Sequence, residues 1–274
     1  MANSLGVKRT TLYLWINEEA TLPGNIYLRI DPKREFYSFV IDERENSWGQ
    51  RVGGKNSSGT TKVIKLPSKS VALAELCGII IGDGNIFIST RKKVYTLRIA
   101  GHSVEDYNYL ITHVSPLITK LFKISTRIYS SKRALCCYVI ADSVRLCEFL
   151  NSLEIKDGNK KKNNQHIPSW IKADKQLSSA FIRGLIDTDG SIHRMSKKDP
   201  NLLRISFKSH IPNLLQETYL VLTALGYSPV ISHSSHQIVL SRQSEIKKYV
   251  NEIGFSNEKH IKRYQLFNTR SPVV

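Results

Sequence analysis

An internal repeat constrains this chain more than any other feature of its sequence. The clearer copy spans residues 176–192, where an apolar segment runs directly into Asp189-Gly190 and then into a segment with the pattern of a strand. The apolar residues share one helical stripe, which indicates a helix packed against a core. They are Leu177, Ala180, Phe181, Gly184, Leu185 and Thr188. Asp174 stands at the N-cap position of this helix, and Gly190 supplies the turn expected to end it.

The second copy lies 106 positions upstream, in residues 73–86. Three pairs show the match: Gly78 with Gly184, Asp83 with Asp189, and Ser103 with Ser209. A repeat of about a hundred residues predicts two copies of one fold rather than a solenoid. Each helix also ends in a carboxylate, which the negative end of the helix dipole disfavours by roughly 0.3–1 kcal/mol. A positively charged group is therefore expected close to Asp83 and Asp189.

The segments after each apolar helix alternate between strand hairpins and further helices. In the first copy the expected hairpins turn at 91–93 and 131–133, and helices cover about 104–122 and 143–153. The resulting order, αββαββα, predicts an antiparallel α+β unit whose helices cover one sheet face and leave the other free. The apolar helices lack a polar side, so we expect them to pack against each other as well as against their own sheets.

The two helices resemble the signature of the LAGLIDADG homing endonucleases. The matching windows are Leu76–Gly84 (LCGIIIGDG) and Ile182–Gly190 (IRGLIDTDG), and the resemblance covers roughly residues 67–270. It implies two pseudo-symmetric repeats whose antiparallel sheets form a DNA-binding saddle. It further implies a monomeric, site-specific endonuclease that cuts double-stranded DNA, as in intron homing.

The predicted organisation has five parts. Residues 1–30 resemble a partial helix-turn-helix of the repressor type, with Gly6 at the turn and Lys8, Arg9 and Thr10 on or beside a recognition helix. The remaining parts are a linker with short strands (31–66, with strands at 36–41 and 63–66 and a flexible Gly/Ser-rich stretch at 51–61), the first repeat (67–156), a basic connector (157–173) and the second repeat (174–274).

Composition favours a polyanionic partner inside the cell. The net charge is +17, from 40 Lys and Arg against 23 Asp and Glu, and such an excess suits phosphate contacts. The four cysteines lack the spacing of a zinc site and suit a reducing compartment. No signal peptide and no apolar run of about twenty residues is found, so we expect a soluble, cytoplasmic protein without membrane contact.

Paired helices would bring Asp83 and Asp189 side by side, and two carboxylates together favour a shared cation. The resemblance implies that each Asp serves a divalent metal for phosphodiester hydrolysis, with Gly82 and Thr188 as neighbouring ligands. Mg²⁺ is the expected ion and Mn²⁺ a possible substitute. Asp187 has Ile81 as its counterpart and is treated as secondary, a helix-turn or surface contact.

The family often places a lysine near the metal after the closing helix of each repeat. The candidates are Lys160 or Lys161 in the first repeat and Lys259 in the second. Their role would be to stabilise developing charge or to activate water. The sequence leaves open which member of the 160–162 lysine run lies near the motif.

DNA contacts are expected on the free sheet faces, because a twisted sheet can read the major groove. The candidates in the first repeat are Arg91, Lys92, Arg98, Arg127, Tyr129, Lys132, Arg133 and Tyr138. Those in the second repeat are Arg194, Lys197, Lys198, Arg204, Lys208, His233, His236 and Gln237. The two sets differ while the cores agree, which predicts a long, asymmetric target site.

Two alternatives of the same fold compete with the nuclease. One is a DNA-binding regulator that does not cleave, and the other is a maturase that binds intron RNA. The partial helix-turn-helix favours them slightly, whereas the presence of both motif aspartates favours cleavage. Protein splicing is not expected, because an intein needs a nucleophile at its first residue and this sequence begins Met1-Ala2.

Overall fold

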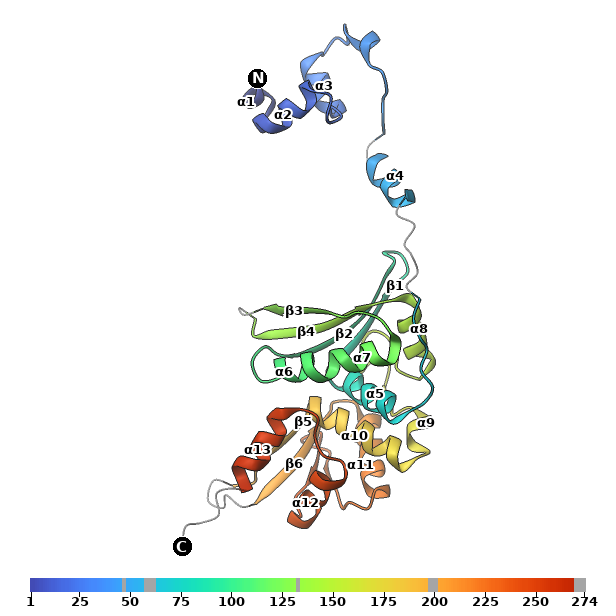
Figure 1. Ribbon diagram of the computed structural model, residues 1–274, viewed down its shortest axis with the longest axis vertical. Helices are drawn as coiled ribbons and strands as arrows, with labels where there is room; N and C mark the ends of the chain where they lie inside the picture. The colour runs from blue at the N-terminus through green and yellow to red at the C-terminus, as the bar shows by residue number, and fades with distance from the viewer. Residues whose placement is uncertain (46–47, 57–62, 132–133, 197–201, 269–274) are drawn as a thin grey trace. The chain divides into compact units, whose positions relative to one another are not determined.

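The computed structural model describes residues 1–45, 48–56, 63–131, 134–196 and 202–268. The chain divides into two compact units, Met1–Thr60 and Thr61–Val274, and the second contains both repeats (Figure 1). Among the described helices, none is both long and apolar enough to cross a membrane.

The first unit contains helices α1 (Ala2–Leu5), α2 (Arg9–Ile16), α3 (Gly24–Ile30) and α4 (Trp48–Asn56). Gly6 follows α1 in the left-handed conformation, with φ 70°, and so supplies the turn before α2. The Arg29 guanidinium on α3 donates hydrogen bonds to the carbonyl oxygens of Ser4 (2.8 Å) and Leu5 (3.1 Å), where α1 ends. This arrangement contains the expected turn between two short helices, but DNA contact by this unit stays a prediction.

The short strands expected within the 31–66 linker are not formed by the residues that the structure describes there. Tyr37–Phe39 form a 3₁₀ turn in place of a strand, α4 occupies part of the stretch expected to be flexible, and 63–66 run as coil. The buried Asp31 carboxylate explains the first difference. It accepts hydrogen bonds from the backbone N–H groups of Glu35 and Phe36, both at 2.9 Å, and so folds this stretch into a local turn.

The second unit repeats one αββαββα order, which confirms the predicted α+β class. The first copy comprises α5 (Val71–Asp83), β1 (Gly84–Ser89), β2 (Val94–His102), α6 (Tyr107–Tyr109), a π-helical turn η2 (Leu110–Val114), α7 (Ser115–Phe122), β3 (Arg127–Ser131), β4 (Cys136–Asp142) and α8 (Val144–Ser152). A short helix α9 (Ser169–Lys172) follows. The second copy comprises α10 (Lys175–Asp189), β5 (Gly190–Arg194), β6 (Leu203–Lys208), α11 (Pro212–Ala224), β7 (Val230–Ser232), β8 (Gln237–Leu240) and α12 (Gln243–Glu252), followed by α13 (Glu258–Asn268).

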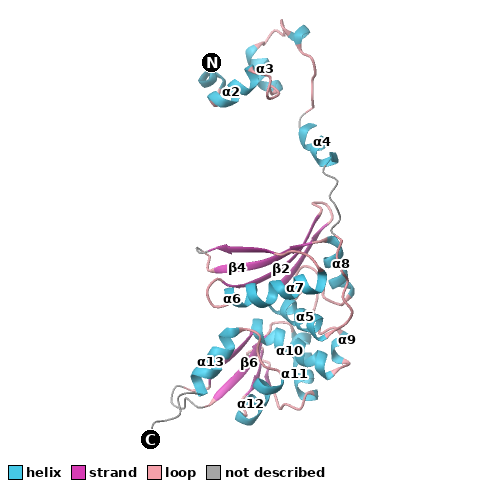
Figure 2. Cartoon of the chain, viewed as in Figure 1, coloured by secondary structure: helices cyan, strands magenta, loops and turns pink. Residues whose placement is uncertain are grey.

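Each copy builds one four-stranded antiparallel sheet (Figure 2). The strand orders are β1-β2-β4-β3 and β5-β6-β8-β7, which are equivalent in the two copies. Helices α5 and α10 lie side by side at the centre of the unit, between the two sheets (Figure 1). They start at the caps Ser70 and Asp174, and Asp174 Oδ1 accepts hydrogen bonds from the N–H groups of Gln176 (2.7 Å) and Leu177 (2.9 Å), as predicted.

The glycines that end both motif helices act through close packing rather than through a left-handed turn. Gly84 has φ −85° and Gly190 has φ −96°, which any residue can adopt. A Cβ atom at Gly190 would lie 2.5 Å from the Ile186 carbonyl oxygen and 2.7 Å from its Cα. The expectation that Gly190 is needed for a turn in the left-handed conformation is therefore corrected. Glycine is needed here because the preceding turn of the helix occupies the space that a side chain would fill.

Candidate active site and nucleic-acid interface

The two motif aspartates lie at equivalent ends of the paired helices. Asp83 is the last residue of α5 and Asp189 is the last residue of α10. A Cβ atom at Gly82 would collide with Thr188 Oγ1 and would lie 3.7 Å from Asp189 Cγ. The final turns of the two helices are therefore in direct contact, and their carboxylates share one site.

Both carboxylates have raised pKa values. Asp83 is half-buried, and loss of hydration raises its pKa, while nearby Lys259 and Lys160 oppose the shift. The Asp189 side chain reaches solvent, but surrounding protein atoms partly desolvate it and raise its pKa to about 6, and the charge of Asp83 adds to the rise. Two carboxylates that disfavour each other's charge form a site that a cation would stabilise.

Lys160 is the member of the lysine run that reaches the motif. Its Nζ donates a hydrogen bond to the Ile81 carbonyl oxygen (2.8 Å) and a second one to that of Gly82. Burial lowers its pKa to about 8, and the charges of Asp189 and Asp83 oppose the change. Lys161 is exposed and makes no such contact. Of the two candidates in the first repeat, Lys160 is thus the one that contacts the motif helix, and its catalytic role stays a prediction.

Lys259 lies beside the same pair from the second repeat. It is the strongest positive influence on Asp83, and its Nζ forms an ion pair with Asp106 Oδ1 at 2.7 Å. The charges of Lys160 and Lys259 therefore act on both carboxylates. A positive group was expected here because the helix dipole disfavours an Asp at a helix C-terminus.

The oxygen atoms at this site could supply some, but not all, of the ligands of a hard divalent cation. Within the described ranges no group of three or more His, Cys, Asp or Glu forms a complete metal site. The Asp83 and Asp189 carboxylates are oxygen donors with no hydrogen-bond partner among the described residues, and oxygen is the ligand that Mg²⁺ and Mn²⁺ prefer. The Gly82 carbonyl oxygen already accepts from Lys160, and the Thr188 hydroxyl donates to the Gly184 and Leu185 carbonyl oxygens, both at 3.0 Å. The two carboxylates therefore provide the main part of any cation site, and phosphate oxygens would have to complete it.

A buried polar network beside the paired helices was not predicted from the sequence. Glu75 on α5 accepts hydrogen bonds from Arg183 Nη2 (2.6 Å) and Ser256 Oγ (2.7 Å), and lies 2.8 Å from His113 Nε2. These partners overcome the effect of burial and lower the pKa of Glu75 to about 2. The only signal in the sequence was a single Glu in an otherwise apolar helix, because its partners are 38 to 181 residues away.

Asp187 belongs to this network and corrects another expectation. A helix-turn or surface contact is expected from the sequence, but Asp187 is completely buried. Its Oδ2 accepts a hydrogen bond from the Ser256 N–H (2.8 Å), and its Oδ1 has no partner within the described part of the chain. Burial raises its pKa to about 7.

The outer face of the first sheet carries several of the predicted DNA contacts. Strand register places Arg98 opposite Ile140, and Tyr138 opposite Ala100 and Tyr129, on the face away from buried Leu97 and Ile99. The Arg98 guanidinium lies 4.9 Å from the centre of the Tyr138 ring, which stacks on Tyr129 at 6.2 Å. Arg127 shares this face and pairs with Asp142, and Arg91 and Lys92 lie exposed in the β1–β2 turn.

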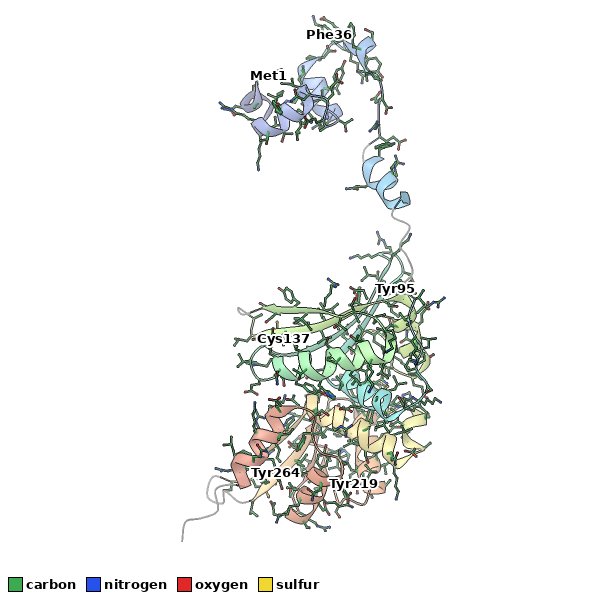
Figure 3. All side chains as sticks on the ribbon, in the orientation of Figure 1. Met1, Phe36, Tyr95, Cys137, Tyr219 and Tyr264 are labelled. Atoms are coloured by element: carbon green, nitrogen blue, oxygen red, sulfur yellow. The ribbon has the colours of Figure 1, made fainter. Side chains whose placement is uncertain are left out.

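The outer face of the second sheet also carries predicted DNA contacts. Arg204 lies opposite His193, and Lys208 lies opposite Gln237, on the face away from buried Ile192 and Ile205. His233 and His236 are exposed in the β7–β8 turn. Figure 3 draws the side chains of both repeats and labels Tyr95 and Cys137 in the first and Tyr219 and Tyr264 in the second as points of reference.

Arg194 is an exception among the predicted DNA contacts. It pairs with Leu203, on the same face as buried Ile192, and its guanidinium lies 4.7 Å from the centre of the Phe267 ring of α13. Side chains alternate between the two faces of a strand, and this alternation turns Arg194 toward the helices. Because Arg194 is the last residue of its strand, the sequence offers little evidence of which face it would take. The predicted contacts Lys132, Arg133, Lys197 and Lys198 lie outside the described residues.

Comparison with known proteins finds similarity to one family over part of the chain. Residues 176–254 match the family model described as a LAGLIDADG-like domain. The replication factor C small subunit of Methanocaldococcus jannaschii is 23% identical over 219 residues, which are 80% of this chain but only 11% of that protein's length. The homing endonuclease I-DmoI, solved in complex with DNA and Mn, is 24% identical over 67% of this chain and 96% of its own, with a TM-score of 0.46. I-LtrWI bound to its target DNA is 14% identical over 73% of this chain and 89% of its own, also with a TM-score of 0.46.

Proposed function

We propose, from the match of residues 176–254 to the LAGLIDADG-like domain model, that the protein is a site-specific endonuclease that hydrolyses both strands of double-stranded DNA. The observation that supports this most directly is the pairing of Asp83 and Asp189 at equivalent helix ends, where the positive charges of Lys160 and Lys259 act on both carboxylates. A purely structural pair of helices would gain nothing from carboxylates at these ends, where the helix dipoles oppose them.

The roles of the residues follow from their positions. Asp83 and Asp189 would hold Mg²⁺ or Mn²⁺ together with phosphate oxygens, and the main-chain oxygens of Gly82 and Thr188 lie in the same two helix turns. When bound, the cation would lower the pKa of a water molecule and neutralise charge on the leaving oxygen. Lys160 and Lys259 would stabilise the negative charge that develops on the phosphate in the transition state.

Recognition is assigned to the outer faces of the two sheets. Arg98, Tyr129 and Tyr138 on the first and Arg204, Lys208 and Gln237 on the second offer donors and aromatic surface for base edges and phosphates. Both faces carry cationic side chains, but the first adds the stacked rings of Tyr129 and Tyr138. Because one chain carries both faces, we expect a monomer that binds a long, asymmetric site.

The test is a cleavage selection with the full-length protein. Purified protein and Mg²⁺ are incubated with a pool of genomic or randomised DNA, and new double-strand ends are sequenced. The matched controls are Asp83→Asn and Asp189→Asn, which remove a charge without changing the shape of the side chain. Site-specific ends that disappear in both controls would establish the activity and identify the target.

Tight binding to DNA without new ends, in Mg²⁺ and in Mn²⁺, would overturn the nuclease. The protein would then belong with the non-cleaving DNA-binding regulators. The first unit would gain weight in that case, because the turn at Gly6 between α1 and α2 is a feature that a helix-turn-helix requires. Preferential binding of a structured RNA would instead indicate the maturase.

A further inference from the structure

A loop of the first repeat holds the start of α13, the helix that carries Lys259. Asn108 Nδ2 donates a hydrogen bond to Glu258 Oε1 (2.7 Å), and Arg263 Nη2 pairs with Glu105 Oε2 (2.9 Å). Between these two surface contacts lies Asp106, which is only 9% exposed. Residues 105–108, which run from the β2–α6 loop into α6, therefore contact the first part of a helix that belongs to the other repeat.

One carboxylate oxygen of Asp106 binds the backbone of its own repeat, and the other binds side chains of the second repeat. Its Oδ2 accepts a hydrogen bond from the His102 N–H at 2.9 Å. Its Oδ1 accepts from Asn257 Nδ2 at 2.9 Å and from Lys259 Nζ at 2.7 Å. Burial acts to raise the pKa of Asp106, but the hydrogen bonds from Lys259, Asn257 and the His102 N–H outweigh it and lower the pKa, so this carboxylate is charged. Because the oxygen atoms have defined donors, the carboxylate cannot turn to follow the lysine.

Lys259 is correspondingly restrained at both of its ends. Its backbone N–H donates to Asn257 Oδ1 at 3.1 Å, and its Nζ is held by Asp106. The Lys259 and Asp106 side chains are only 15% and 12% exposed, so solvent screens their attraction little. A long, flexible side chain is thereby kept in one position beside Asp83.

The other half of the site has no carboxylate equivalent to Asp106. At the repeat offset of 106 residues, Glu105 and Asp106 correspond to Ile211 and Pro212, which have no charge. Lys160 accordingly lies against main-chain carbonyl oxygens of α5 and has no carboxylate hydrogen-bond partner in the part of the chain that the structure describes. The two lysines are thus positioned by different means in the two halves.

We propose that Asp106 is the positioning residue for Lys259 and that this ion pair makes the two half-sites unequal, so that the two DNA strands are cut at different rates. This assignment rests on the proposed endonuclease function. The pair keeps the Lys259 ammonium where charge develops on one scissile phosphate, and displacement of a positioned group by about 1 Å can reduce a rate up to about a hundredfold. Removal of Asp106 should therefore affect one strand selectively.

The experiment follows the two strands separately. Full-length protein is mixed with a supercoiled plasmid that carries the selected target, nicked and linear products are quantified over time, and primer extension identifies the nicked strand. The variants are Asp106→Asn, Lys259→Met and the double variant. Glu105→Gln is the matched control, because it removes a charge from the same loop and an exposed contact to the same helix.

We expect Asp106→Asn to slow one strand by about tenfold while the other stays within about twofold of wild type. Lys259→Met should slow the same strand, and the double variant should be no slower than Lys259→Met alone. Glu105→Gln should behave as wild type. Midpoints of denaturant unfolding add a readout that needs no catalysis, and the two single substitutions should be non-additive there.

Two results would overturn the assignment. Equal slowing of both strands by Asp106→Asn would mark Asp106 as a structural link between the repeats, and so would additive effects on strand cleavage in the double variant. A wild-type protein that binds the target but cuts neither strand is a different outcome. It would overturn the endonuclease function and the positioning role with it, and non-additive unfolding would then describe the pair as a structural link.

Discussion

Gly78 and Gly184 occupy equivalent positions on α5 and α10, and each leaves no room for a side chain against the other helix. A Cβ atom at Gly78 would collide with the Phe181 carbonyl oxygen and lie 2.9 Å from the Leu185 nitrogen. A Cβ atom at Gly184 would collide with the Glu75 carbonyl oxygen and lie 3.0 Å from the Ile79 nitrogen. The obstacles are backbone atoms, so the approach of the helices, and with it the distance between Asp83 and Asp189, depends on these glycines.

Gly184→Ala is expected to destabilise the second unit. The added methyl group must push the two helices apart, and overpacking of this kind costs about 1–3 kcal/mol, which outweighs the gain of about 1 kcal/mol from alanine's higher helix propensity. Denaturant unfolding measures the loss, and cleavage at saturating DNA should fall further than the loss of folded protein explains. Gly53→Ala in α4 is the control, because no atom beyond its chain neighbours and the backbone of its own helix lies within 4 Å of its Cβ position. Equal stability of Gly184→Ala and wild type would show that the helices cross less closely.

Glu75→Gln is expected to destabilise the fold strongly near neutral pH. The substitution leaves Arg183 without its partner at the interface between the repeats, and breaking a buried ion pair in this way costs up to about 3–5 kcal/mol. The pKa of Glu75 is about 2 in the folded protein, below its usual 4.5, so its contribution is present above pH 4.5 and is lost as the pH falls toward 2. Unfolding of both proteins between pH 2 and 7 should therefore show a difference that shrinks on acidification. A difference independent of pH would contradict the ionised pair.

Asp187→Asn is expected to have the opposite pH dependence. The pKa of Asp187 is raised from 3.8 to about 7 in the folded state, so the folded protein holds a proton that the unfolded chain releases. Wild type should therefore lose stability relative to the variant as the pH rises from about 4 to about 7, by up to about 1.4 kcal/mol for each unit between the two pKa values. Unfolding free energies across this range provide the measurement. Parallel curves for the two proteins would mean that Asp187 is ionised throughout.

The sequence predicted the repeats, the element order and the position of both motif aspartates because these depend on local patterns. Helical stripes, alternating strands and N-caps are encoded by residues a few positions apart. The duplication shows each of these patterns in two copies, which fixes where each element begins and ends. The pairing of Asp83 with Asp189 followed from the repeat together with the apolar character of both helices and the family resemblance.

The sequence did not predict contacts that join distant segments. The partners of Glu75 lie on three different elements, and nothing local to Asp106 indicates that it holds Lys259, 153 residues away. Lys160 could not be separated from Lys161, since adjacent residues of a polar connector have no periodicity to orient them. Arg194 was misplaced because a strand that ends at this residue gives little evidence of which face it points to.

Lys160→Met is expected to reduce cleavage of at least one strand by about a hundredfold or more, the usual effect of removing a group that stabilises transition-state charge. Its Nζ is anchored on the Ile81 and Gly82 carbonyl oxygens beside the carboxylate pair. Lys161→Met removes a neighbouring but exposed charge and should leave the single-turnover rate at saturating DNA close to wild type. Single-turnover kinetics with both variants decide the point. Equal loss in the two would mean that the lysine run acts only by attracting DNA.

Arg98→Ala and Arg194→Ala should separate the two faces of the sheets. Arg98 lies on the outer face, exposed above the Tyr138 ring, so its loss should weaken DNA binding and reduce the slope of log affinity against log salt by about one. Arg194 lies over Phe267 on the helix side, so its loss should lower stability and leave the salt dependence unchanged. Binding to the target measured between 50 and 200 mM salt, in the presence of Ca²⁺, tests both expectations. A reduced salt slope for Arg194→Ala would place this guanidinium against phosphate and would reverse the assignment of the sheet faces.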